Sequence, residues 1–172
     1  MANNFEFTMP ALSFTGARGS SSPAAIVAQA VTNSYRTAWA FDDTTKETIN
    51  SVEWTCPEAY TGSGTLKIKI HFVSAATTGT AVFGGMIEAF TPGTDTNNLI
   101  STDSFDNSSD NLGSTNLSGT SSGSPQAQTV TMTAKDSIAS GDICRLAVYR
   151  NVATDGVSGD LFVYAVDVFE ET

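Results

Sequence analysis

The stretch Leu66-Lys67-Ile68-Lys69-Ile70-His71-Phe72 alternates apolar and polar residues without interruption. Successive side chains of an extended strand point to opposite faces, so the two lysines and the histidine share one face. The leucine, both isoleucines and the phenylalanine share the other. One polar face and one apolar face are typical of an antiparallel sheet that covers a core on one side only. The stretch therefore predicts a half-buried strand in an antiparallel sheet.

The same period of two recurs through the rest of the chain. Residues 129–133 and 144–149 repeat it, whereas residues 161–169 are apolar on both faces, which predicts a central or covered strand. Further segments of strand composition are separated by turn residues: 35–41, 48–54, 80–90 and 99–105. Gly84-Gly85 within one of them predicts a bulge or a sharp bend. About eight strands at this spacing predict an all-β fold, an antiparallel β-sandwich of the jelly-roll type.

The sequence divides into an N-terminal extended arm, residues 1–34, and a jelly-roll β-sandwich domain, residues 35–172. Apolar residues of the arm lie outside the sandwich pattern: Phe5, Phe7, Met9, Leu12 and Phe14. They are expected to anchor the arm on a partner by strand addition, or else to form an N-terminal strand of the same domain. Residues 22–31 are the one segment of helical composition. The tract 106–125, rich in Ser, Thr, Asn and Gly, is predicted to be a long flexible loop.

Charge and composition exclude several classes of function. The 172 residues hold eight Lys and Arg against 18 Asp and Glu, a formal net charge of −10. Nucleic-acid binders rely on basic side chains, and anionic membranes attract them, so neither partner is expected. The start of the chain shows no secretion signal, and no apolar run approaches the roughly 20 residues of a membrane span. In a cytoplasm, Cys56 and Cys144 are then expected to be buried thiols, with a disulfide as the alternative.

The chain lacks the usual constellations of catalysis. Its single histidine, His71, lies mid-strand and is expected to be an exposed sheet residue rather than a general base. No nucleophile elbow, phosphate loop or dinucleotide motif is present, and the carboxylates match no calcium loop. We therefore expect no enzymatic activity, no catalytic residue, no metal site and no cofactor. Trp39 and Trp54 are either core residues, which their apolar neighbours favour, or platforms on which a sugar stacks.

Several segments together resemble the single-jelly-roll virion structural proteins of tailed bacteriophages, which include capsid decoration (cement) proteins and head fibres. The segments that carry the likeness follow in this order: Arg36-Thr37-Ala38-Trp39-Ala40-Phe41-Asp42-Asp43, Val52-Glu53-Trp54, Cys56-Pro57, Gly64-Thr65-Leu66-Lys67-Ile68, the strand with Gly84-Gly85, Ser140–Arg150 and Asp160–Phe169. The resemblance covers about residues 35–170. It is a pattern of strand and turn residues, and it transfers no binding residue.

The resemblance implies a non-enzymatic virion structural protein, most simply capsid cement. Such a protein sits on the outer capsid surface after synthesis in the host cytoplasm. It acts as a homo-oligomer, a dimer or trimer, that bridges subunits of the major capsid protein and stabilises the shell by mass action. The anchors expected for this role are the five apolar residues of the arm. The alternative is a carbohydrate- or receptor-binding module of a phage fibre or tail, which requires exposed aromatic side chains.

Overall fold

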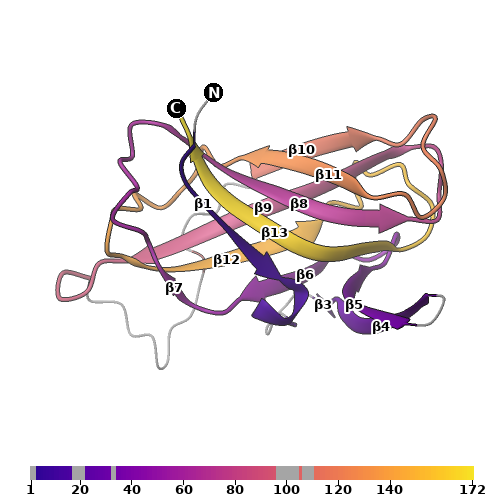
Figure 1. The fold of residues 1–172 in the computed structure, drawn as a ribbon, viewed down its shortest axis with the longest axis horizontal. Helices are drawn as coiled ribbons and strands as arrows, with labels where there is room; N and C mark the ends of the chain where they lie inside the picture. Colours follow the sequence, from indigo (N-terminus) through magenta and orange to yellow (C-terminus); the bar gives the residue numbers. More distant parts are fainter. Residues whose placement is uncertain (1–2, 17–21, 32–33, 96–104, 106–110) are drawn as a thin grey trace.

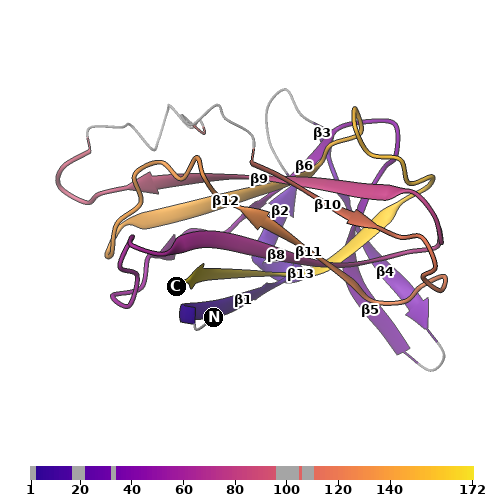
Figure 2. The ribbon, with the colours of Figure 1, turned by 90° about the horizontal axis from the view of Figure 1, so that it is seen from above.

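Two antiparallel sheets pack face to face in the computed structural model of this chain (Figures 1 and 2). The structure describes residues 3–16, 22–31, 34–95, 105 and 111–172. Within these residues the one helical element is a short 3₁₀ turn, η1 (Ala11–Ser13). None of the helices in the described part of the chain is long and apolar enough to cross a membrane. The predicted all-β antiparallel sandwich is confirmed.

The first sheet, called sheet A, has the order β11-β8-β13-β5-β4, with β1 beside β13. Its strands have these bounds: β11 (Gln126–Thr131), β8 (Thr65–Ser74), β13 (Leu161–Glu171), β5 (Ser34–Phe41), β4 (Ala25–Val31) and β1 (Asn3–Pro10). Strands β1 and β5 share one edge of β13, where β5 pairs with residues 161–163 and β1 with residues 165–171. This central position of β13 explains why its sequence is apolar on both faces.

The second sheet, called sheet B, has the order β10-β9-β12-β6-β2, with β3 beside β6 and β7 beside β12. Its strands have these bounds: β10 (Asn111–Asn116), β9 (Thr80–Phe90), β12 (Ile143–Arg150), β6 (Glu47–Ser51), β2 (Phe14–Gly16), β3 (Ser22–Pro23) and β7 (Trp54–Thr55). Every pairing among the described strands is antiparallel except that of β3 with β6. The predicted strand 99–105 lies outside the described residues except for Phe105, which is not in a strand.

The core fills the space between the sheets, as the alternation in β8 predicts. The four apolar residues of its deciding stretch are buried, and Lys67, Lys69 and His71 on the opposite face are partly exposed. Across the core, the Phe83 ring from sheet B meets two rings from sheet A, with centroids 5.7 Å from Phe41 and 5.2 Å from Phe72. Burial of large apolar side chains from both sheets is the main stabilising term of such a sandwich.

The N-terminal residues belong to the two sheets, which corresponds to the second of the two alternatives for the arm. Three of the predicted anchors, Phe5, Met9 and Phe14, are buried in the common core. Phe7 is half-buried and packs on Trp54, with ring centroids 4.8 Å apart. Leu12 alone among the five is exposed, at 72%. The reason is that β1 completes an edge of β13 that would otherwise lack a partner, so the apolar residues of β1 are used within the domain.

Three local expectations are corrected. Residues 22–31 form β3 and β4 rather than a helix, because β4 pairs with β5 along its whole length. The tract 106–125 is described from residue 111 and contains β10, paired with β9, so that part of it is not a loop. Gly84-Gly85 produces no bulge, since the register of β9 with β10 and β12 runs through both glycines unbroken. Their role is close packing: a Cβ on Gly84 would lie 2.2 Å from Cζ of Tyr149.

Candidate binding face

The outer face of sheet A gathers aromatic and polar side chains around an irregularity in β13. The register of β13 with β8 shifts between Val163 and Ala165, so Tyr164 is an extra residue at a bulge. A bulge bends its strand and re-aims side chains. Phe162 and Tyr164 are both only partly buried. The bulge therefore presents two aromatic side chains of the central strand close to the surface.

A depression with a volume of about 430 Å³ lies over the end of sheet A next to these rings. Its main lining residues come from β5, β8, β13 and the turn before β11: Arg36, Val73, Ser122, Pro125, Phe162 and Tyr164. A second depression of about 340 Å³ is lined by Pro10, Ala11, Leu12 and Thr37, and it shares Arg36 and Tyr164 with the first. We call the two depressions together the sheet A groove. It is an open trough with the Arg36–Tyr164 pair at its middle.

The charge in the sheet A groove is positive. Arg36 is exposed, and it is the one charged side chain among the described residues that line the two depressions. Burial raises the pKa of Tyr164, and the positive charge of Arg36 opposes this effect in part. The Tyr164 hydroxyl therefore stays protonated at neutral pH. The groove thus offers two aromatic surfaces, one guanidinium and a phenol.

A cluster of polar side chains lies further along β13 on the same face. Asp167 accepts a hydrogen bond from Thr8 of β1 at 2.6 Å and pairs with Nε2 of His71 on β8 at 2.6 Å. Burial alone would raise the pKa of Asp167, but hydrogen bonds from His71 and Thr8 and the charges of His71 and Lys69 hold it below its usual 3.8. The Thr8 hydroxyl donates to the Asp167 carboxylate and not to the His71 imidazole. The cluster therefore does not pair a nucleophilic hydroxyl with a general base. Its effect is to join three strands.

The aromatic residues singled out from the sequence lie elsewhere. Trp39 is 6% exposed, and its indole N–H donates to the Ala11 carbonyl at 2.7 Å. Trp54 is half-buried against Phe7. The core role of Trp39 is confirmed, and neither tryptophan lines the sheet A groove. Sequence reasoning missed Arg36, Phe162 and Tyr164; the aromatic residues at outward positions of residues 161–169 were the only indication of them.

Both cysteines are buried, as expected, and neither is in a disulfide. Burial raises the pKa of Cys56 to about 11, and it also raises the pKa of Cys144. Thiols with so little thiolate at neutral pH are poor nucleophiles and poor metal ligands. No group of three or more His, Cys, Asp or Glu side chains within the described ranges could hold a metal ion.

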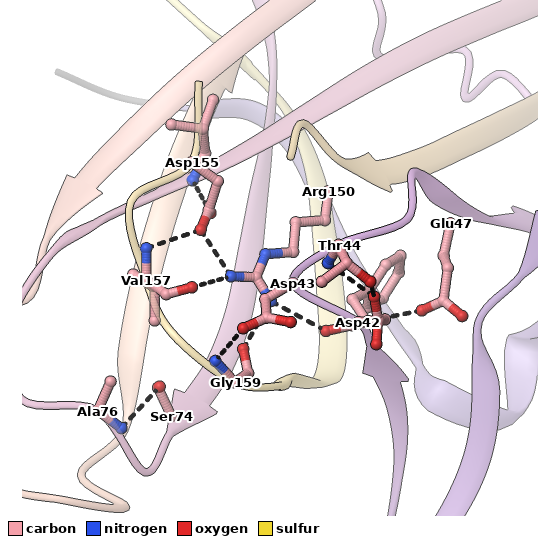
Figure 3. A network of polar contacts seen from close by, with 12 residues as sticks. Asp42, Asp43, Thr44, Glu47, Ser74, Ala76, Arg150, Asp155, Val157 and Gly159 are labelled. Carbon is pink, nitrogen blue, oxygen red and sulfur yellow. Dashed lines mark hydrogen bonds and ion pairs between the residues drawn. The ribbon is translucent and has the colours of Figure 1, made fainter. Parts of the chain in front are cut away.

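The neighbouring carboxylates of Asp42 and Asp43 serve turns. Asp42 accepts hydrogen bonds from the backbone N–H groups of Thr44 and Thr45, and Asp43 accepts one from Gly159 (Figure 3). Beside them lies the buried Arg150, which pairs with Asp155 at 2.6 Å. These contacts hold the loop ends together.

A separate hollow lies on sheet B, and it is a weaker candidate for a binding site than the sheet A groove. Thr15, Asn50 and Glu53 line it together with Arg145. However, Arg145 forms an ion pair with the buried Glu88, and its guanidinium stacks over Phe105 with 4.5 Å to the ring centroid. The cation of this hollow is therefore already neutralised, whereas Arg36 in the sheet A groove has no acidic partner within the described residues.

Comparison with known proteins yields no family. No family model matches the chain, and no curated protein matches it. A solved carbohydrate-binding module specific for non-crystalline cellulose, CBM28, is similar over 92% of this chain and 87% of its own, with a TM-score of 0.45 and 12% identity. TmCBM61, solved with β-1,4-galactotriose, has the same coverage with a TM-score of 0.38 and 10% identity. Both scores are below 0.5, so these likenesses assign neither a family nor a ligand.

Proposed function

We propose that the protein is a non-enzymatic binding module that holds a carbohydrate chain in the sheet A groove. The observation that carries the proposal is the pair of partly exposed rings, Phe162 and Tyr164, beside Arg36 in an open trough. A sugar ring has an apolar C–H face that packs on an aromatic ring and a rim of hydroxyls that need hydrogen bonds. Binding sites combine such apolar surface with a few fixed polar groups.

The composition of the groove favours binding over turnover. Among the described residues that line the two depressions there is no His, Cys, Asp or Glu, which are the side chains that most often act as general bases or strong nucleophiles. The two depressions join at shared residues, which suits an extended ligand better than a small compact one. Strands β5, β8 and β13 supply about half of the described lining, so this part of the groove is preformed and costs little ordering on binding.

Alanine substitution in the groove tests the proposal. Titration calorimetry on oligosaccharides selected from a glycan array should give about tenfold weaker binding for Phe162→Ala and for Tyr164→Ala, about 1.4 kcal/mol each. Phe90→Ala is the matched control, because Phe90 is also a partly buried aromatic residue but lies on sheet B, away from the groove. Absence of binding to every glycan on a broad array, or equal losses in the control, would reject the proposal.

The role in capsid decoration stays a prediction. Its partner would be the major capsid protein, and its active form would be a dimer or trimer. The exposed side chain of Leu12 supports a protein contact near the end of β1. The buried positions of Phe5, Met9 and Phe14 remove three of the five expected anchors from the surface. Cosedimentation of the purified protein with capsids, and its loss in Leu12→Ser, tests this alternative; a protein that stays in the supernatant rejects it.

A further inference from the structure

We infer that the carbohydrate is anionic and that a uronate carboxylate binds Arg36 at the middle of the sheet A groove. This inference rests on the proposed function and adds the chemical class of the ligand. Two features of the described residues lead to it: the charge balance of the groove against that of the whole chain, and the position of Arg36 where the two depressions meet.

The charge of the groove is opposite to that of the protein. The chain carries a formal charge of −10, yet the described residues that line the two depressions include one arginine, Arg36, and no acidic residue. Three other cations in the described part of the chain have acidic partners: Arg150 has Asp155, Arg145 has Glu88 and Lys67 has Glu171. Arg36 has no such ion pair there, so a bound carboxylate would not compete with an internal acid.

The chemistry of the lining fits a carboxylated sugar. A guanidinium presents parallel N–H donors that match the two oxygens of a carboxylate. Tyr164 lines the same two depressions as Arg36, so a saccharide chain that passes from one depression into the other crosses this pair. Stacking on the aromatic rings then supplies affinity, and Arg36 discriminates acidic from neutral sugars.

The test compares uronate oligosaccharides with their carboxyl-reduced neutral counterparts, by calorimetry at low salt. The full chain should bind the acidic form at least tenfold more tightly, and 0.5 M NaCl should remove most of the difference. Arg36→Gln should bind both forms equally, and Arg36→Lys should keep part of the preference. Lys69→Gln is the control, because Lys69 lies on the outer face of β8 but outside the groove, and it should retain the full preference.

The outcomes separate the inference from the function on which it rests. Equal binding of acidic and neutral oligosaccharides by the unaltered protein overturns the inference and leaves the binding module intact. An equal loss of the preference for the acidic oligosaccharide in Lys69→Gln and Arg36→Gln would show that the preference arises from the overall charge of the protein rather than from Arg36. That result would also overturn the inference. If no oligosaccharide of either kind binds, both proposals fail. If light scattering shows a dimer that Arg36→Gln dissociates and that no sugar displaces, the groove is a contact between copies and the inference is wrong.

Discussion

Arg150 shows how one side chain holds a whole end of the sandwich. It is completely buried, and its guanidinium donates to the carbonyls of Phe41 and Gly159 at 3.1 and 2.7 Å as well as to Asp155 (Figure 3). Asp155 in turn accepts from the backbone N–H groups of Val157 and Val82. The ion pair therefore joins β5, β9 and the loop after β12 in one network.

Arg150→Gln should destabilise the fold by about 3–5 kcal/mol, because it leaves the Asp155 carboxylate buried without its cation. Chemical denaturation followed by circular dichroism measures the free energy of unfolding. Lys69→Gln, a partly exposed lysine without a partner of this kind, should change it by less than about 0.5 kcal/mol. If the free energy of unfolding falls by less than about 1 kcal/mol in Arg150→Gln, the prediction is wrong, and water solvates the Asp155 carboxylate in place of the guanidinium.

Gly84→Ala should destabilise the fold by about 1–3 kcal/mol, because overpacking forces a ring or a strand to move. The added Cβ would lie 2.2 Å from Cζ and 2.3 Å from the hydroxyl oxygen of Tyr149, which is itself fully buried. Gly156→Ala is the control, since the nearest atom to its added Cβ is 3.6 Å away. Thermal unfolding of both variants checks this, and an unchanged midpoint for Gly84→Ala would contradict it.

At the level of the element, β1 is a strand of the domain's own sheet. Met9→Ala should therefore cost about 2–5 kcal/mol of stability, as expected for a buried methionine. Leu12→Ala, three residues along the chain, should cost less than about 0.5 kcal/mol, because its side chain is exposed. Urea denaturation of the two variants measures the difference. Equal and small effects would mean that β1 detaches from β13 in solution.

The carboxylate of Asp167 links three elements and predicts a dependence on pH. Its pKa is lower in the folded protein than in the unfolded chain, so its contribution is complete above about pH 4 and is lost as pH falls through the folded pKa. Asp167→Asn should therefore show a shallower fall of the unfolding free energy between about pH 5 and about pH 2 than the parent protein. Asp160→Asn, an exposed site, serves as the control. Parallel profiles for parent and Asp167→Asn would contradict this.

At the level of the whole molecule, one core serves both sheets. The buried apolar cluster contains residues of β1 and β5 in sheet A and of β2, β9 and β12 in sheet B. A single core predicts one cooperative transition. Trp39 lies in sheet A and Trp54 in sheet B, so their fluorescence follows both layers and should change together with the circular dichroism signal. Different unfolding midpoints for fluorescence and for circular dichroism would show that one sheet or the N-terminal strands unfold first.

The strands of this protein follow from its sequence, because their pattern is local. Alternation in residues 66–72 identified β8 and its buried face, and a double apolar face identified β13 as central. These features depend on the period of two in an extended chain and need no knowledge of distant residues. The sequence likewise predicted the buried cysteines and the core position of Trp39.

Only the tertiary structure decided which strands pair with each other. Whether residues 3–16 pair with β13 or with another protein depends on which sheet edge is open, and residues 22–31 became strands because β5 offered such an edge. The sheet A groove joins Arg36 to Tyr164 across 128 positions of sequence, through strand order and a bulge that no local pattern shows. Local alternation determines which residues face a core, whereas the geometry of assembled sheets determines which residues face each other.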